Sequence, residues 1–157
     1  MKKLLALMLA AALALSLAAC GGGDSSGGAA SKEVELTAEN ITDYIALSGE
    51  FTESEYHQTI LYYVSTSIID FQAYSTVSGS FENVEITVRA NIDDTGVLNE
   101  QWHLADSEEP GVEFTFKLPA NGNYTHSYGI ECDRNSGKLK GSCDFTIVSV
   151  SGTYMPA

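Results

Sequence analysis

Basic residues are scarce in this chain. Eight lysines and arginines stand against 21 aspartates and glutamates, which gives a formal net charge of −13. Such an acidic chain repels phosphate backbones, so we expect no nucleic-acid partner. It also repels anionic lipid headgroups, so any attachment to a membrane has to come from a covalent anchor.

Long hydrophobic runs are missing as well. The longest run, Leu4–Leu15, has 12 residues of Leu, Ala and Met and follows the basic start Met1–Lys3. A helix needs about 20 apolar residues to span a bilayer. A basic start, a short apolar run and small residues before a cleavage point are typical of a secretory signal peptide. We therefore expect residues 1–19 to be a signal peptide and the protein to be exported.

The signal segment ends in Leu17-Ala18-Ala19-Cys20. This resembles the lipobox of bacterial lipoprotein signal peptides, which has a leucine, two small residues and an obligatory cysteine. The resemblance covers residues 1–20. It implies that a diacylglyceryl group is attached to the Cys20 thiol, that the chain is cut before Cys20, and that the acylated protein (palmitate being one such acyl group) lies on the extracytoplasmic face of the cell membrane. An ordinary signal peptide with a chance cysteine is the alternative.

The mature chain divides into a linker and one domain. Residues 20–32 are the lipidated cysteine and a Gly/Ser-rich linker, whose composition cannot bury apolar surface. Residues 33–157 are expected to form a single folded domain, because 44% hydrophobic and 18% charged residues are typical of a globular protein. Cleavage removes two lysines, so the mature chain would carry a net charge of −15.

The segment Val34–Leu47, at the start of the domain, is expected to open with a short helix. Thr37 can cap this helix, and Gly49 can end it. The apolar residues that share one helical face are Ile41, Tyr44 and Ile45.

Downstream, the hydrophobic period changes to two, which is typical of strands with one buried and one wet face. Alternation of this kind covers residues 69–77, 84–92, 112–118, 124–130 and 145–150, with shorter strands expected at 60–64 and 102–104. Turn signals separate these segments. Six or seven short strands without βαβ alternation predict an all-β, antiparallel β-sandwich.

Two segments carry a further resemblance. Residues 83–98 and 109–116 combine a strand, an Asp/Gly turn and a Pro-Gly ahead of an aromatic strand. In this they resemble the FxLYD-type immunoglobulin-like domains of bacterial lipoproteins, although the Phe-x-Leu-Tyr-Asp string itself is absent. The resemblance implies an immunoglobulin-like sandwich and no catalytic residues.

Cysteine is sparse, with three in the chain. Cys20 is assigned to the lipid, which leaves Cys132 and Cys143 as an even pair in an exported domain, and we expect them to form a disulfide. The turn-rich segment between them predicts a hairpin. A turn centred on Gly137-Lys138 places the cysteines face to face, whereas one centred on Ser136-Gly137 places them diagonally. Two free thiols are the alternative. A metal site is not expected, because two cysteines need further ligands.

Catalytic signatures are missing too. His57, His103 and His126 are scattered without a His-Glu-x-x-His string, and residues 33–157 contain no Gly-x-Ser-x-Gly elbow. We therefore expect a non-catalytic domain, without a cofactor beyond the lipid, that binds an unidentified protein or glycan or assembles in the envelope. A small hydrolase with paired carboxylates is one alternative, because two carboxylates distant in sequence can meet in space.

A carbohydrate- or calcium-binding module is the other alternative. Asn91-Ile92-Asp93-Asp94-Thr95-Gly96 partly imitates a calcium loop, but Trp102 stands at position 12, where an EF-hand needs Glu, and a hairpin turn explains the segment better. A different calcium site using Asp93, Asp94 or the cluster Asp106–Glu109 stays open. Eight tyrosines and Trp102 can stack on sugars, or they can pack within the sheet.

Overall fold

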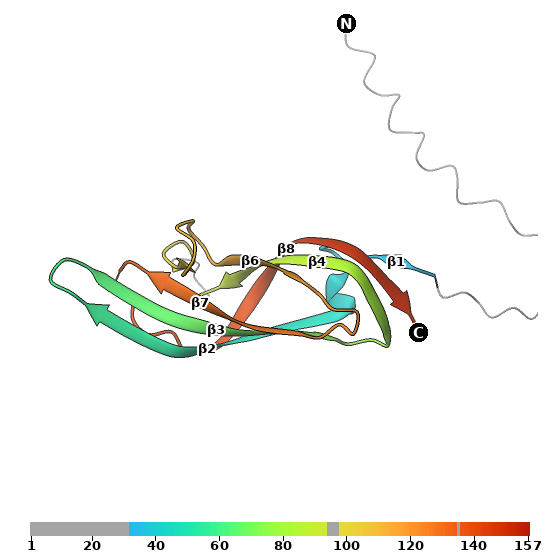
Figure 1. Ribbon diagram of the computed structural model, residues 1–157, viewed down its shortest axis with the longest axis horizontal. Coiled ribbons are helices and arrows are strands. Elements are labelled where there is room, and N and C mark those ends of the chain that lie inside the picture. Colours follow the sequence, from blue (N-terminus) through green and yellow to red (C-terminus); the bar gives the residue numbers. More distant parts are fainter. Residues whose placement is uncertain (1–31, 94–97, 135) are drawn as a thin grey trace, which may run out of the picture. The chain divides into compact units, whose positions relative to one another are not determined.

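The computed structural model describes residues 32–93, 98–134 and 136–157 (Figure 1). The predicted signal peptide, Cys20 and nearly all of the predicted linker lie outside the described residues, as does most of the Asp93–Gly96 turn. Ser31–Ala157 form one compact unit. All of its buried apolar residues lie between Leu36 and Tyr154, so this unit contains its own core.

The unit is built almost entirely of strands. They are β1 (Val34–Glu35), β2 (Ile45–Gln58), β3 (Tyr63–Ser75), β4 (Gly79–Asn91), β5 (His103–Leu104), β6 (Glu113–Lys117), β7 (Tyr124–Cys132) and β8 (Gly141–Pro156). The ladders between them are antiparallel. The predicted all-β, antiparallel class is thereby confirmed.

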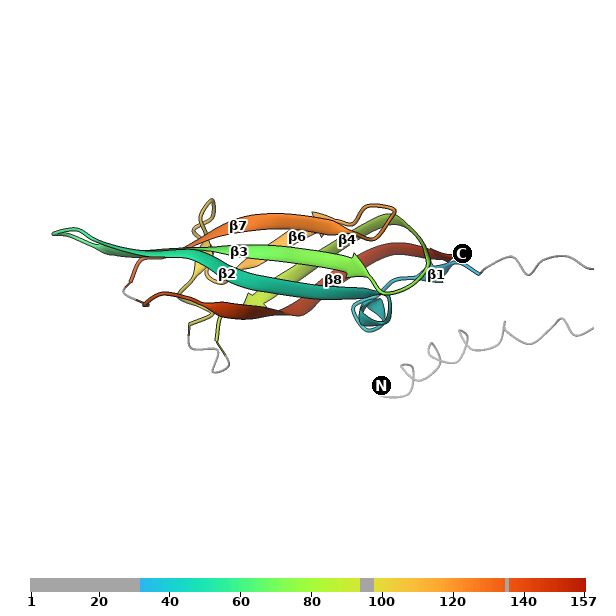
Figure 2. The ribbon, with the colours of Figure 1, turned by 90° about the horizontal axis from the view of Figure 1, so that it is seen from below.

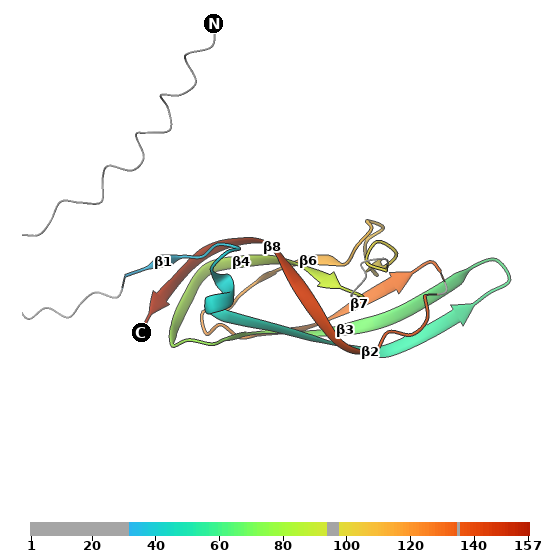
Figure 3. The ribbon, with the colours of Figure 1, turned by 180° about the vertical axis from the view of Figure 1, so that it is seen from behind.

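The strands follow the order β5-β7-β3-β2-β8-β4-β6, and β1 pairs with the far end of β8. β8 joins the two layers, because Gly141–Cys143 pairs with β2 whereas Asp144–Pro156 pairs with β4. Figures 1 and 3 show β8 passing from the layer of β2 and β3 to the layer of β4 and β6. The sheet is therefore curled until it is nearly closed as a barrel. Its edge strand β6 meets the part of β7 that the short strand β5 leaves unpaired.

The core follows from the period-two alternation. The side chains that β4 buries are Phe81, Val84, Ile86, Val88 and Ala90, and those that β6 buries are Phe114 and Phe116. Phe71 of β3 lies at the centre, with its ring centroid 4.9–5.1 Å from those of Phe114, Phe116 and Phe145. Aromatic side chains from both layers thus pack into one cluster.

The predicted N-terminal helix is wrong. Within the described parts of the chain, the helical structure at this place is a 3₁₀ turn at Ile41–Asp43, and β2 begins at Ile45, opposite Ser75 of β3. The four-residue spacing of Ile41 and Ile45 is compatible with one face of a helix. In the structure, however, buried Ile41 lies in the 3₁₀ turn and buried Ile45 is the first residue of β2. Pairing with β3 satisfies the backbone from Ile45 onward, so the local helical pattern is overridden.

Gly49, which was expected to end that helix, lies inside β2 opposite Phe71 and Cys143. A Cβ atom at this position would lie 2.7 Å from Cζ of Phe145. The glycine therefore leaves room for an aromatic ring of the neighbouring strand to cross over β2.

Candidate functional site

The structure separates the two cysteines that were predicted to form a disulfide. Cys132 of β7 lies opposite Ser65 of β3, and Cys143 of β8 lies opposite Gly49 of β2. Two strands stand between β7 and β8. The cysteines are thus three strand spacings apart across the sheet, about 14 Å. They are also offset along the strands, because Gly49 pairs with Phe71, six residues from Ser65 on β3, whereas a disulfide needs Cα atoms within about 7 Å. Both thiols are free and buried, so the predicted hairpin is wrong and the predicted disulfide is not formed.

Each thiol has its own polar neighbour. Sγ of Cys132 lies 2.8 Å from Oγ of Ser136, and Sγ of Cys143 donates to the carbonyl oxygen of Asn91 at 3.8 Å. Burial raises the pKa of the Cys143 thiol to about 12. A thiol that stays protonated at neutral pH is a weak nucleophile. Cys20, the predicted lipidation site, lies outside the described residues.

The three histidines are kept apart. Nε2 of His57 lies 3.0 Å from Oε2 of Glu55 near the end of β2. The ring of His103 bonds to the backbone of its own strand, β5, and the ring of His126 packs edge-on against Tyr128 with centroids 4.5 Å apart. Among the described residues, no group of three or more His, Cys, Asp or Glu side chains could hold a metal ion.

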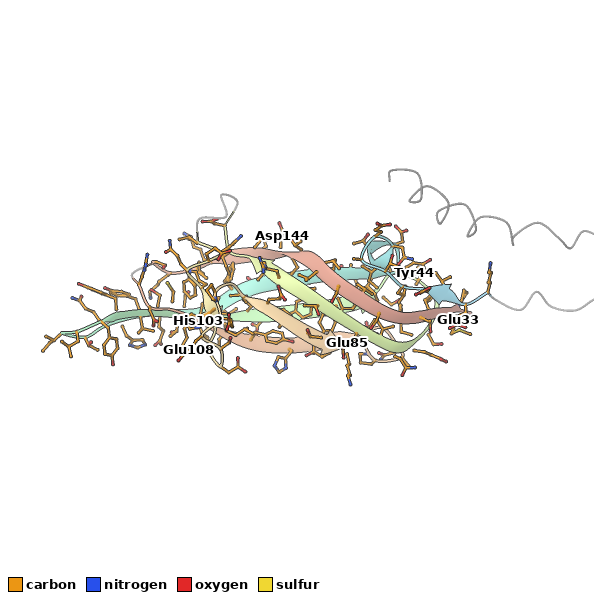
Figure 4. All side chains as sticks on the ribbon, turned by 90° about the horizontal axis from the view of Figure 1, so that it is seen from above. Glu33, Tyr44, Glu85, His103, Glu108 and Asp144 are labelled. Carbon is orange, nitrogen blue, oxygen red and sulfur yellow. The ribbon has the colours of Figure 1, made fainter. Side chains whose placement is uncertain are left out.

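An acidic recess of about 580 Å³ lies beside β5 and the end of β7. Figure 4 labels two of its lining residues, His103 and Glu108, and its other carboxylates are those of Asp106, Glu131 and Asp133. These groups face water, since the buried polar side chains of the described residues are those of two serines. The recess is therefore open to water, whereas the general acid of a glycosidase lies in an apolar pocket.

An aromatic seam closes the barrel between β6 and β7. Tyr124 and Tyr128 of β7 stack on Phe116 and Phe114 of β6, with ring centroids 4.7 and 3.7 Å apart. Burial, together with the nearby Tyr124 hydroxyl, raises the pKa of the Tyr128 phenol well above its usual value. One face of each of these tyrosine rings packs against a phenylalanine, and Trp102 is fully buried, so Trp102 cannot stack on a sugar.

A two-stranded hairpin arm, residues 56–64, extends beyond the rest of the sheet. β8 leaves β2 at Phe51 and β7 leaves β3 at Ser65. Beyond these points the residues of the arm pair only with each other, as His57 does with Val64. Figures 1 and 2 show the arm projecting from the body at the end opposite β1.

The base of the arm is fixed by a bulge and by buried hydroxyls. The ladder between β2 and β3 is irregular between Thr52 and Glu55, where Glu53 has a φ of 49°. Oγ of buried Ser67 donates to the Thr52 carbonyl oxygen at 3.2 Å, and Oγ of Ser54 donates to Oγ of Ser67 at 3.1 Å. Because the bulge has satisfied polar groups, the direction in which the arm leaves the body is defined.

The apex of the arm departs from ordinary turn chemistry. The Thr59 N–H donates to the Tyr62 carbonyl oxygen at 2.9 Å, which makes Ile60 and Leu61 the central residues of the turn. Turns favour Gly, Asn, Asp, Ser and Pro, yet here two aliphatic side chains are exposed by 102% and 90%, and Tyr62 and Tyr63 follow at 59% and 44%. Four consecutive large apolar side chains thus face water at the tip of the molecular unit.

The sequence-based prediction missed this feature. It assigned a strand to residues 60–64, whereas β3 begins only at Tyr63 and the preceding residues form the turn. Two signals were present. Residues 58–69 contain no charged side chain in a strongly acidic chain, and they also contain none of the Gly, Pro, Asn or Asp residues that mark a turn.

Among the residues that the structure describes, no helix has the length and hydropathy needed to cross a bilayer. No family model matches the chain, and neither the curated proteins nor the solved structures contain a match to it.

Proposed function

We propose that the protein is a membrane-anchored, extracytoplasmic lipoprotein whose folded domain is a non-catalytic binding module, with the hairpin arm as its contact surface. The observation that carries this proposal is the exposed pair Ile60 and Leu61 at the apex. These side chains contribute no burial to the fold, and contiguous exposed apolar patches on a soluble domain mark interaction sites.

The anchor is proposed from the lipobox resemblance that ends at Cys20. The chain enters the folded unit at β1, and Figure 4 labels Glu33 at the end of the unit opposite the arm. A lipid at Cys20 would therefore hold the domain by one end and leave the contact surface at the other. Two acyl chains are needed for stable attachment, because a single chain binds only marginally.

We also propose that the immunoglobulin-like sandwich is a useful description of the layering. Its support is the pair of facing layers, β2 with β3 and β4 with β6, whose aromatic side chains meet at Phe71. Cross-strand contacts of β8 measured by NMR test this. Contacts with β2 that are confined to Gly141–Cys143 favour two facing layers, and contacts that extend further along β8 favour one continuous sheet.

Radiolabelled palmitate tests the anchor. Cells expressing the wild-type chain should incorporate label into the protein, and the Cys20→Ala variant should incorporate none, because the other two cysteines are far from the signal boundary. Label that persists in the variant would contradict the lipoprotein proposal.

A photoreactive amino acid tests the contact surface in intact cells. Placed at Leu61, it should form covalent adducts on irradiation. Placed at Val148, which is 46% exposed on β8, it serves as the matched control and should form few. Equal adduct yields at the two positions would contradict the role of the arm.

One observation favours a second candidate, a carbohydrate-binding module. Tyr56 and Tyr63 of the arm lie with their rings 6.2 Å apart and inclined by 16°, and exposed parallel rings can stack on sugar faces. A glycan array with the folded domain tests this candidate. The water-facing carboxylates of the acidic recess supply no comparable argument for the hydrolase or calcium alternatives.

A further inference from the structure

We infer that the hairpin arm inserts its apex into the interfacial zone of a lipid bilayer. This inference rests on the proposed function in treating the arm as the contact surface of the domain, and it names the occupant of that surface. It is independent of the lipid proposed at Cys20.

The shape of the arm suits shallow insertion. Ile60 and Leu61 are the outermost residues of a narrow two-stranded hairpin. They lie about two residue steps beyond the last arm pairs, or about 7 Å at the rise of a β-strand. Interfacial elements bury their apolar side chains about 5–10 Å into the boundary between headgroups and acyl chains. The two aliphatic side chains would reach that boundary before the polar base of the arm meets the headgroups.

The tyrosines of the arm lie just behind its apex, at the depth where membrane-bound proteins carry tyrosine. Tyr62 and Tyr63 directly follow the aliphatic pair, and Tyr56 stacks against Tyr63 from the opposite strand. Tyrosine is enriched at both water interfaces of membranes, since its ring is apolar and its hydroxyl is polar. An aliphatic apex with tyrosines behind it therefore matches the polarity profile from acyl chains to headgroups.

Part of the apex backbone is hydrogen-bonded within the turn. Thr59 Oγ1 accepts from the Tyr62 N–H at 3.1 Å and from the Leu61 N–H at 3.3 Å, and the Thr59 N–H donates to the Tyr62 carbonyl oxygen at 2.9 Å. Internal partners matter most where water is absent, because each unsatisfied backbone group is costly in a bilayer. Thr59 thus lowers the number of backbone N–H groups that would lose a hydrogen-bond partner when the turn enters a bilayer.

The charge distribution of the domain favours an uncharged lipid surface over an anionic one. No charged side chain lies between Gln58 and Ile69, whereas the whole chain carries a net charge of −13. The arm can enter an uncharged bilayer without burying a charge, but the acidic body is repelled by an anionic one. Binding should therefore be strongest on zwitterionic lipid.

A protein partner is less well suited to this apex. Stable protein interfaces bury about 800 Å² on each partner, far more than two aliphatic side chains and parts of two tyrosines provide. A second copy offers, besides its own equally small apex, only Tyr74 and Val148 as exposed large hydrophobic side chains among the described residues. A bilayer requires neither a large area nor shape complementarity.

Both attachments can act on one membrane. Twelve residue steps separate Cys20 from Lys32, and an extended chain of that length reaches about 40 Å. The 14 residues of β2 span about 46 Å. A domain tethered at its β1 end could thus lie along the bilayer with the arm inserted at the other end.

The test uses residues 32–157, a compact unit with its own core and without Cys20. This domain is mixed with excess phosphatidylcholine vesicles and the bound fraction is measured by flotation. The wild-type domain should float with the vesicles, and replacing part of the lipid with phosphatidylglycerol should reduce binding. The double variant Ile60→Ser, Leu61→Ser should bind at least about tenfold more weakly, whereas Val148→Ser should bind like the wild type.

A depth measurement keeps the outcome decisive. Leu61→Trp should show tryptophan fluorescence that is quenched by bromines placed high on the acyl chains. The inference is overturned if the wild-type domain fails to float, if the apex and Val148 variants behave alike, if binding requires anionic lipid, or if light scattering shows a dimer that the apex variant abolishes. Failure of the domain to float while the full chain still incorporates palmitate would reject arm insertion and leave the lipid anchor standing.

Discussion

Aliphatic side chains are buried in the barrel body but exposed on the hairpin arm. In β4, Ile86 and Val88 are fully buried, whereas on the arm Ile60 and Leu61 are exposed by 102% and 90%. The body has a second layer that covers its apolar face, and the arm has none. Folding therefore explains the apolar residues of the body but not those of the arm, for which we propose contact with a surface outside the domain.

The largest effect should come from the centre of the body. Phe71→Ala removes the ring that contacts Phe114, Phe116 and Phe145. Such a substitution should lower the free energy of unfolding by about 3–5 kcal/mol, a large part of the roughly 5–15 kcal/mol of an ordinary domain. Urea unfolding of residues 32–157 measures it, and a loss below about 1 kcal/mol would show that this ring is not central to the core.

Gly152→Ala should come next. Gly152 has a φ of +112°, and a Cβ atom there would lie 2.6 Å from Cα of Val84. Backbone strain and a collision with backbone that cannot rotate away should together cost about 2–4 kcal/mol. Gly137→Ala is the matched control, since its φ is +75° but nothing lies within 4 Å of the added atom. Equal melting temperatures for the two variants would rule out the collision at Gly152.

A smaller effect should arise at the base of the arm. Ser67→Ala removes the hydroxyl that donates to the Thr52 carbonyl oxygen and accepts from Ser54. Leaving these groups without their partner should cost about 1–2 kcal/mol and speed amide exchange in the arm. Ser149→Ala, at an exposed position of β8, should stay within about 0.5 kcal/mol of the wild type. Similar losses for the two serines would remove the distinction between the base of the arm and the outer face of the body.

The thiols should produce a modest pH effect. Burial raises the pKa of Cys143 from 9.0 in the unfolded chain to about 12, so the folded state favours the protonated thiol. The stabilisation is complete below pH 9 and declines as the pH rises toward 12. A Cys143→Ser variant should therefore lose less stability than the wild type over that range.

The two cysteines of the folded domain should also be unbonded. Mass spectrometry of non-reduced, alkylated peptides should find both Cys132 and Cys143 as alkylated thiols, and a peptide crosslinked through the two cysteines would contradict the strand order.

The smallest change in stability should be at the apex. Ile60→Ser with Leu61→Ser removes no buried contact, so the free energy of unfolding should stay within about 0.5 kcal/mol of the wild type. The same urea titration checks this. A loss comparable to that of Phe71→Ala would mean that the arm belongs to the core, and its exposure could no longer be taken as a sign of function.

The sequence predicts local structure well where one face of a strand is buried. Alternation over residues 84–92 and 112–118 corresponds to β4 and β6, because each has a core on one side and water on the other. β2 was missed because only Ile45 and Phe51 of its 14 residues are buried. With most of its side chains at least partly exposed, it carries little hydrophobic period to detect.

Long-range features could not be predicted in the same way. The prediction of a Cys132–Cys143 hairpin assumed that strands adjacent in sequence also pair, whereas β7 pairs with β3 and β8 with β2 and β4. The arm exists because β2 and β3 extend beyond the strands that flank them. Its length depends on the points at which pairing with β7 and β8 stops. Neither the strand order nor those end points leave a periodic signal in the chain.

Hydrogen–deuterium exchange of residues 32–157, with and without phosphatidylcholine vesicles, tests the central claim most directly. Lipid should slow exchange at residues 58–63 and leave β4 and β8 unchanged. Exchange that slows on the body instead, or that does not change at all on addition of lipid, would contradict the assignment of the hairpin arm as a membrane-contacting surface.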